Sequence, residues 1–161
     1  MQLELDVEGW PAGEWEALAS RAARAAGEVE PLLARPRLQV SVLLTGDDEV
    51  HALNREWRGR DKATNVLSFP MLTREELAAI GGGGPPVLLG DVAMAAGVCA
   101  HEAKAKGIAI EDHAAHLLIH GLFHLAGRDH VNSDAEADAM EALETRALAK
   151  LGIADPYGTS N

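Results

Sequence analysis

The sequence predicts an α+β fold, in which a small mixed β-sheet of about four strands packs with about five to six helices. Two observations lead to this prediction. Strand-like and helical patterns alternate over residues 1–94, whereas the patterns that follow are helical. The chain has 161 residues, of which 47% are hydrophobic, and this suits a single domain over residues 1–161.

The first elements follow from apolar periodicity and turn residues. Residues 2–7 alternate apolar and polar side chains, which predicts a half-buried strand. Pro11 suits the first turn of a helix, and the helical spacing that follows is expected to end at Gly27. Residues 37–45 are rich in apolar and β-branched side chains and predict a second strand, and the acidic residues after it favour a helix over 47–57.

The middle of the chain predicts two more strands. Residues 65–69 are short and apolar and are stopped by Pro70, so we expect a buried strand. Residues 71–86 end in a run of glycine and proline and are interpreted as a flexible surface excursion with room for one helical turn. Residues 87–94 form the last predicted strand, in which Gly90 indicates a bulge or a close backbone approach.

The C-terminal half is helical in pattern. Three helices are expected, over residues 95–106, 111–126 and 133–151. The last of them opens with Ser133 and Glu136 at capping-box spacing. Residues 152–161 are interpreted as a tail. The order of the strands in the sheet does not follow from the sequence.

Composition limits the possible partners. The chain has 14 Lys and Arg against 25 Asp and Glu, a formal net charge of -11, so contact with nucleic acid or anionic lipid must be local. Cys99 is the single cysteine, and the first ten residues lack the basic and apolar regions of a signal peptide. No apolar run approaches the roughly 20 residues that span a bilayer. We therefore expect a cytoplasmic protein with no membrane contact.

Five of the seven histidines lie within residues 113–130, and their spacing predicts a metal site. His120 and His124 are four residues apart in a predicted helix, so their imidazoles leave the same face. Gly127 then interrupts the helix, and the following turn brings back His130. Three histidines with an open fourth position are typical of catalytic zinc, so one zinc per chain is expected on this helix and the turn after it.

The other two histidines of this cluster and one nearby acid allow more than one interpretation. His116 could line the cleft, orient a ligand or lie on the helix surface, and His113 fits a solvated surface better. Asp129 could be a proton acceptor, a partner of a ligand or a turn cap. Peptidases of the H-E-x-x-H type have a glutamate after the first histidine, but Gly121 occupies that position here, which disfavours peptide hydrolysis by that route.

The best basic segment is residues 55–62, with four cations and two acids. From spacing alone, solvated surface is the simpler interpretation. An arginine beside a metal could instead bind a phosphate in bidentate fashion. Aromatic residues make up only 4% of the chain, so recognition by a base-stacking sheet is not expected.

The string HGLFHLAGRDH, residues 120–130, resembles the H-G-x-x-H-L-x-G-x-D-H signature of the YbeY family of bacterial endoribonucleases. LNREWRGRDKATNVLSFP, residues 53–70, and LLGDVAM, residues 88–94, resemble two further family signatures. The sequence departs from the family pattern at Ala63, where proline is usual, and at Arg128, where tyrosine is usual.

The resemblance implies that the three motif histidines bind zinc and that Arg58 lies in the active cleft. It also implies single-strand-specific cleavage of RNA, maturation of the 3′ end of 16S rRNA, and contact with ribosomal particles and their proteins. The alternatives are a zinc metallohydrolase of another class, such as an amidase or peptidase, and a non-catalytic ribosome-assembly factor with a zinc-organised site. For the nuclease, Arg58 is expected to bind the scissile phosphate, with Asp129 and His116 as candidate proton acceptors.

Overall fold

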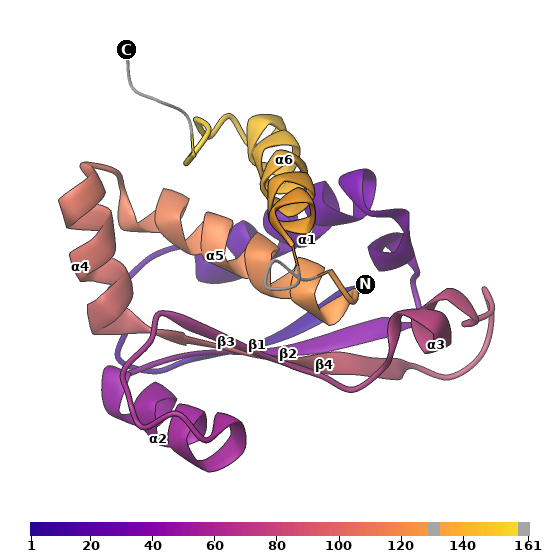
Figure 1. The fold of residues 1–161 in the computed structure, drawn as a ribbon, viewed down its shortest axis with the longest axis horizontal. Helices are drawn as coiled ribbons and strands as arrows, with labels where there is room; N and C mark the ends of the chain where they lie inside the picture. Colours follow the sequence, from indigo (N-terminus) through magenta and orange to yellow (C-terminus); the bar gives the residue numbers. More distant parts are fainter. Residues whose placement is uncertain (129–132, 158–161) are drawn as a thin grey trace.

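The computed structural model describes residues 1–128 and 133–157 (Figure 1). The predicted α+β class with a mixed sheet of four strands is confirmed. The elements, in chain order, are β1 (Gln2–Val7), α1 (Trp15–Val29), the 3-10 helix η1 (Pro31–Ala34), β2 (Leu38–Thr45), α2 (Asp47–Arg58), β3 (Val66–Pro70), α3 (Arg74–Ala78), β4 (Val87–Ala95), α4 (Ala96–Lys106), α5 (Ile110–Leu125) and α6 (Asp134–Lys150).

The sheet has the strand order β1-β2-β4-β3. β1, β2 and β4 are parallel, whereas β3 runs antiparallel to β4 and forms one edge. β4 alternates little in burial, as expected for an inner strand covered on both faces. The strand that follows α2 in the sequence therefore lies at the edge, and its outer side is free to border a cleft.

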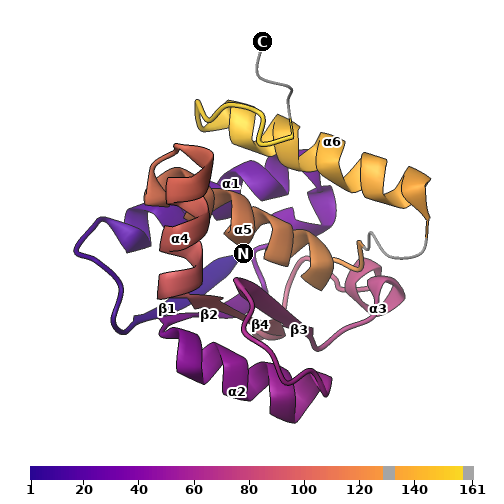
Figure 2. The same cartoon turned by 60° about the vertical axis from the view of Figure 1, so that its left-hand side comes forward.

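Helices cover both faces of this sheet. α2 lies on one face. α5 crosses the other face, where α1 also contacts β1, and α6 packs on the outer side of α1 and α5 (Figures 1 and 2). The main core lies between the sheet and α5, where Ile119, Leu122 and Phe123 have no exposed surface. Apolar burial of this kind stabilises a fold by about 25 cal/mol per Å². None of the helices in residues 1–128 and 133–157 combines the length and apolar character needed to cross a bilayer.

Gly90 marks both features expected of it. The β2–β4 register shifts between Gln39 and Val40, so β4 carries one extra residue beside Gly90. A Cβ atom at Gly90 would collide with the carbonyl oxygen of Phe69 and lie 2.7 Å from Leu125. The glycine therefore lets the edge strand and the end of α5 approach β4 closely.

The first helix differs from its prediction at both ends. α1 begins at Trp15 instead of Pro11, and it continues through Gly27 to Val29. Gly27 lies inside the helix, where it allows close packing: a Cβ at this position would lie 3.3 Å from the Cα of Ala34. The prediction that the helix ends at Gly27 is therefore wrong, because this glycine is a contact point for η1.

Residues 71–86, expected as a flexible surface excursion with room for one helical turn, contain the short helix α3. Thr73 and Glu76 form a capping box, in which the Thr73 hydroxyl accepts from the Glu76 backbone and the Glu76 carboxylate accepts from the Thr73 backbone. Leu77 in this helix is fully buried. This part of the segment is thus packed against the rest of the molecule.

Candidate active site

The candidate site is built on α5, whose histidines form one stripe. His113, His116, His120 and His124 are separated by three, four and four residues, so they follow one another along one side of the helix. His113 and His116 are buried, while His120 and His124 are partly exposed. The stripe therefore runs from the interior of the protein to the surface.

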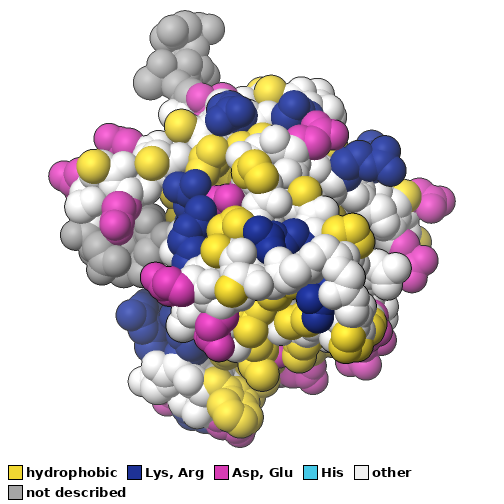
Figure 3. Space-filling view, turned by 90° about the vertical axis from the view of Figure 1, so that its right-hand side faces the viewer, with side chains coloured by type: hydrophobic (Ala, Val, Ile, Leu, Met, Phe, Trp, Pro, Cys, Tyr) yellow, Lys and Arg dark blue, Asp and Glu magenta, His cyan; other side chains and the backbone are white. Residues whose placement is uncertain are grey.

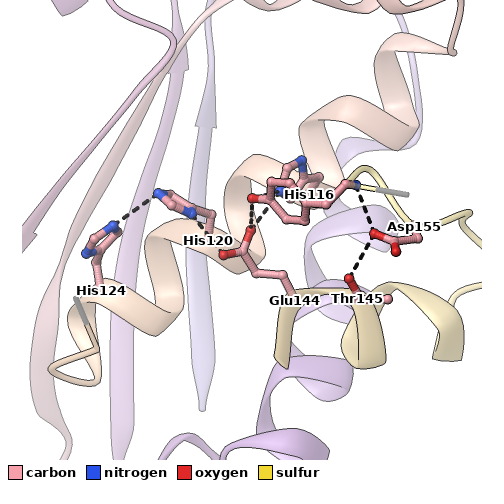
Figure 4. A network of polar contacts seen from close by, with 7 residues as sticks. His116, His120, His124, Glu144, Thr145 and Asp155 are labelled. Carbon is pink, nitrogen blue, oxygen red and sulfur yellow. Dashed lines mark hydrogen bonds and ion pairs between the residues drawn. The ribbon is translucent and has the colours of Figure 1, made fainter. Parts of the chain in front are cut away.

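At the outer end of the stripe, two imidazole nitrogens converge. The Nε2 atoms of His120 and His124 lie 3.0 Å apart (Figure 4). Two nitrogen ligands of a tetrahedral zinc, each bonded at about 2.0 to 2.1 Å, are separated by about 3.3 Å. The pair is therefore close to the separation that a shared zinc ion requires.

The two other residues predicted in this motif, Asp129 and His130, lie outside the described residues. Within residues 1–128 and 133–157, no group of three His, Cys, Asp or Glu side chains is arranged to hold a metal. The described part of the chain thus contributes two of the three predicted ligands. Cys99 is buried, and burial, followed by the charges of Glu102 and Asp47, raises the pKa of its thiol to about 12, so it does not supply a thiolate near neutral pH.

Behind the histidine pair lies a buried carboxylate that the sequence analysis did not identify. Glu144 of α6 is 1% exposed. Its Oε2 atom accepts a hydrogen bond of 3.1 Å from Nδ1 of His120, and its Oε1 atom accepts one of 2.7 Å from Nε2 of His116. The hydroxyl of Tyr157 donates to Oε1 as well, at 2.8 Å. Figure 4 shows Glu144 between His116 and His120.

The surroundings of Glu144 favour its charged form. Burial by itself raises the pKa of this carboxyl, but the hydrogen bonds from His116, His120 and Tyr157 and the charge of His120 outweigh burial. Together they lower the pKa to about 2. Burial and the neighbouring carboxylate raise the pKa of Tyr157, so its hydroxyl remains a donor. Glu144 is therefore an acceptor on both oxygens.

His113, at the inner end of the stripe, has a different partner. Its Nε2 atom lies 2.8 Å from Glu102 of α4, and Glu102 also accepts a hydrogen bond from Asn65 at 3.0 Å. Burial lowers the pKa of His113 more than the bond to Glu102 raises it. His113 is thus a buried group that joins α4 to α5, not the solvated side chain expected from the sequence.

A cleft of about 780 Å³ opens beside the histidine pair. It lies between α5, the edge strand β3 and the segment that joins α2 to β3. Both histidines line it, together with Arg58, Arg60 and Lys62 of the basic segment and Arg128 from the turn after α5. Folding therefore brings the basic segment to the predicted metal ligands, although some 60 residues separate them in the sequence. His116 is not among the lining residues.

Arg58 reaches the cleft because α2 ends beside it. The helix stops at Gly59, whose φ of 69° is a left-handed conformation that glycine adopts without strain. The Nη1 group of Arg58 donates a hydrogen bond of 3.1 Å to the carbonyl oxygen of Ser68 on β3. The Asn54 side chain, which is buried, donates to the carbonyl of Lys62 at 3.0 Å and so fixes the loop. The backbone is thereby held while the cationic side chains remain exposed.

Gly121, which replaces the glutamate of H-E-x-x-H peptidases, faces the sheet. A Cβ atom there would lie 3.3 Å from Val92 and 3.8 Å from Val66. A carboxylate at this position would meet apolar side chains of the sheet, at a desolvation cost. Gly121 also lines the floor of the cleft. The close approach of α5 to β4 therefore explains the glycine.

The turn after α5 is held by a second buried acid, Glu30, which caps the end of α1. Its Oε2 atom accepts from Nε of Arg128 at 2.7 Å and lies 3.3 Å from Arg74 of α3. Arg74 also donates to the carbonyl of Ala126 at 2.7 Å. Arg128, where the family pattern has tyrosine, thus lines the cleft while its Nε group is bonded to Glu30.

The two isolated histidines lie away from this site. His51 of α2 pairs with Asp61 at 2.7 Å, and His101 is exposed on α4. Neither lines the cleft. Both are therefore surface groups outside the candidate site.

Comparison with known proteins identifies relatives along the whole chain. The family model described as Endoribonuclease YbeY matches residues 5–152. The Endoribonuclease YbeY of Erythrobacter litoralis is 63% identical over 98% of both chains, and that of Novosphingobium aromaticivorans is 55% identical over 100% of this chain and 97% of its own. Both the spacing of the motif histidines and the extent of these matches agree with the resemblance seen in the sequence.

The fold is also similar to that of solved structures. The solution structure of a Thermotoga maritima protein matches 97% of this chain and 100% of its own, with a TM-score of 0.56 and 22% sequence identity. At that identity the match bears on the fold alone. The family model and the two close relatives decide the assignment, and the chain belongs to the YbeY family of endoribonucleases.

Proposed function

We propose that this protein is a zinc-dependent endoribonuclease that cleaves single-stranded RNA. One observation carries the proposal: the converging Nε2 atoms of His120 and His124 share a cleft with Arg58. A metal ligand pair beside an exposed arginine suits a phosphodiester, which presents negative charge where the metal binds. Membership of a family of endoribonucleases supports the same reaction.

In this proposal, His120, His124 and His130 hold one zinc ion per chain. When bound, zinc supplies Lewis acidity to the scissile phosphate and the attacking water. The chain's own part is to hold the two described ligands on one rigid helix, so that their separation changes little between states. Placing ligands on packed secondary structure keeps a site within the narrow geometry that catalysis needs.

Arg58 is assigned to the scissile phosphate. It has no carboxylate partner among residues 1–128 and 133–157, so its charge is available to a substrate. One NH1 hydrogen is donated to Ser68, which holds the guanidinium plane at the edge of the cleft. The remaining N–H groups can donate to phosphate oxygens and stabilise the negative charge that develops there.

For the proton acceptor we favour Asp129 over His116. His116 is 6% exposed and its Nε2 atom is bonded to Glu144, so it does not reach a substrate in the cleft. Asp129 lies outside the described residues and keeps its role as a prediction from the motif. The test is the pH profile of RNA cleavage for Asp129→Asn, which should lose its acidic limb if Asp129 accepts the proton.

The proposed natural substrate is single-stranded rRNA on cytoplasmic ribosomal particles, with the 3′ end of 16S rRNA as the processed site. The net charge of -11 disfavours tight binding of free RNA, so presentation by a larger particle helps to explain specific action. Positive charge is available locally, because Arg58, Arg60, Lys62 and Arg128 line the cleft. Elsewhere, as on the face at the α3 end of the molecule, Lys and Arg side chains lie in separate groups with Asp and Glu among them (Figure 3). Ribosomal proteins are accordingly candidate partners.

The test is RNA cleavage by the purified protein with and without a chelator. We expect cleavage of single-stranded RNA that stops with chelator and returns with zinc, and little cleavage of duplex RNA. Hydrolysis of amide substrates instead of RNA would favour the amidase or peptidase. Zinc binding without hydrolysis of any substrate, combined with association with ribosomal particles, would favour the assembly factor.

A further inference from the structure

We propose that Glu144 is a positioning residue, which holds the metal ligand His120 through its Nδ1–H group. Two further side chains, His116 and Tyr157, hold Glu144 in turn. The inference rests on the proposed function, because it takes His120 as a ligand. It concerns how the chain prepares that ligand before the metal arrives.

The hydrogen bond to Glu144 decides which nitrogen of His120 carries the proton. A carboxylate can only accept, so Nδ1 of His120, 3.1 Å away, must be the donor. In a neutral imidazole this leaves Nε2 without a proton, and Nε2 is the atom that faces His124 at 3.0 Å. The carboxylate therefore selects the tautomer, and turns the ring so that its lone pair points toward the metal position.

Glu144 itself is held by two donors on its other oxygen. Nε2 of His116 lies 2.7 Å from Oε1, and Nδ1 of His116 is buried without a hydrogen-bond partner among the described residues. The single proton of a neutral His116 therefore belongs on Nε2, where it has an acceptor. The hydroxyl of Tyr157 is the second donor, at 2.8 Å. With both oxygens engaged, the carboxylate has little freedom to rotate away from His120.

Tyr157 reaches this position because the segment after α6 folds back onto the helix. Asp155 accepts from the Thr145 hydroxyl at 3.0 Å and from the backbone N–H of Tyr157 at 2.8 Å (Figure 4). Thr145 is the neighbour of Glu144 in α6, so the helix anchors the segment that supports its own carboxylate. Residues 153–157, expected as part of a tail, thus have a defined place behind the site.

A purely structural role for Glu144 is the competing explanation, since its bonds also join α5 to α6. The two explanations differ in what an isosteric amide does. In Glu144→Gln the amide oxygen can still accept from His116 and Tyr157, and its NH2 group then faces Nδ1 of His120. Nδ1 of His120 can accept from this NH2 group only when the proton of the imidazole is on Nε2. Nε2 is the atom that must carry no proton to bind zinc.

The first experiment measures zinc affinity of the metal-free protein by competition with a chromogenic chelator. Loss of an orienting partner of a metal-bound histidine lowers affinity about 10- to 100-fold, and we expect this for Glu144→Gln. Glu144→Asp keeps the charge on a shorter side chain and should recover part of the affinity. Tyr157→Phe should weaken binding by a smaller factor. Asp138→Asn, at an exposed carboxylate of the same helix, is the matched control and should change nothing.

The second experiment reads the tautomer of His120 from ¹⁵N chemical shifts of the metal-free protein, which does not depend on activity. The wild type should show the proton on Nδ1, and Glu144→Gln should move it to Nε2. A merely structural carboxylate would change the unfolding midpoint and leave this tautomer as it is. Either an unchanged tautomer or an unchanged zinc affinity in Glu144→Gln overturns the inference.

Failure of the proposed function has a different signature. If the wild type binds no zinc, the ligand assignment is wrong, whatever the tautomer of His120. If the wild type binds zinc and Glu144→Gln binds it equally well, only the positioning role is wrong. Should Glu144→Gln fail to fold, Glu144→Asp and Tyr157→Phe decide: zinc affinity equal to that of the wild type in both variants overturns the inference.

Discussion

The two walls of the cleft are built in opposite ways. On the α5 side, each histidine of the stripe is tied to a protein partner, and Glu144 behind them is 1% exposed. On the α2–β3 side, Asn54 fixes the backbone, but Arg58, Arg60 and Lys62 are exposed. The first wall suits a small ion that demands fixed geometry, and the second suits a flexible polyanion. Changes on one wall should therefore affect metal binding, and changes on the other should affect RNA alone.

The largest effect is expected from His124→Ala. It removes one of the two converging nitrogens, so zinc content should fall from about one per chain to nearly none, and RNA cleavage should be lost with it. Metal analysis of the purified variant measures this. His51→Ala removes a histidine outside the cleft and is the control, which should keep its zinc. Equal losses in both variants would show that the ligands are misassigned.

Next in size is Arg58→Glu, which should separate the two walls. We expect cleavage to fall by about 100- to 1,000-fold because the phosphate loses its charged donor, while zinc content and folding stay unchanged. Arg58→Lys restores the charge without the planar fork and should recover only part of the rate. Single-turnover cleavage with zinc analysis of the same samples measures both. Loss of zinc in Arg58→Glu would mean that the walls are coupled.

Most of the scaffold of both walls could be predicted from the sequence. The apolar periodicities located the strands and the long helices to within a few residues, because those patterns reflect burial against a single sheet. The spacing of His120 and His124 gave one shared helix face in the same way. Such predictions succeed where the signal is local, since neighbours along one element decide it.

The missing parts are contacts between distant segments. Glu144 follows His120 by 24 residues, so no local spacing pairs the two. Helical periodicity does place Glu144 on the buried face of α6, four residues after Met140 and four before Leu148, but that signal does not name its partner. The strand order that puts β3 at the edge, and so brings Arg58 to α5, depends equally on long-range pairing. The α3 capping box is not a long-range contact. Thr73 and Glu76 are three residues apart, so their spacing in the sequence already indicates the start of a helix.

The exposed wall also predicts how RNA binding responds to salt. For a single strand, log affinity falls with log salt at about 0.7 per phosphate contact, so two to four contacts predict a slope of roughly -1.5 to -3. A titration of RNA affinity against salt concentration measures it. A slope steeper than about -5 would indicate an extended basic surface beyond the segment 55–62 and would remove the contrast between a local cationic wall and an otherwise acidic protein.

A smaller effect is expected at Glu30, which joins the turn after α5 to α3. Glu30→Gln leaves the guanidiniums of Arg74 and Arg128 without their charged partner, and since both are more than a third exposed we expect a loss of only about 1 to 2 kcal/mol of unfolding free energy. Urea unfolding measures it. Glu28→Gln is the control on the same helix, because its pair with Lys150 is exposed and should contribute less than about 0.5 kcal/mol. Equal losses would deny Glu30 a special role.

The smallest effect concerns the inner end of the histidine stripe and is a pH dependence of stability. Burial, outweighing the bond to Glu102, lowers the pKa of His113 in the folded protein below its value near 6.5 in the unfolded chain. Between those two values the unfolded chain binds more protons, so acidification favours unfolding and stability falls as the pH drops below about 6.5. In His113→Gln this contribution disappears. The unfolding free energy of the variant, measured by urea titration from pH 7.5 to 5, should therefore decline less steeply than that of the wild type, and the two curves should run parallel above pH 7. Identical slopes below pH 6.5 would show that His113 does not carry this dependence, and that the buried wall owes its acid sensitivity to other groups.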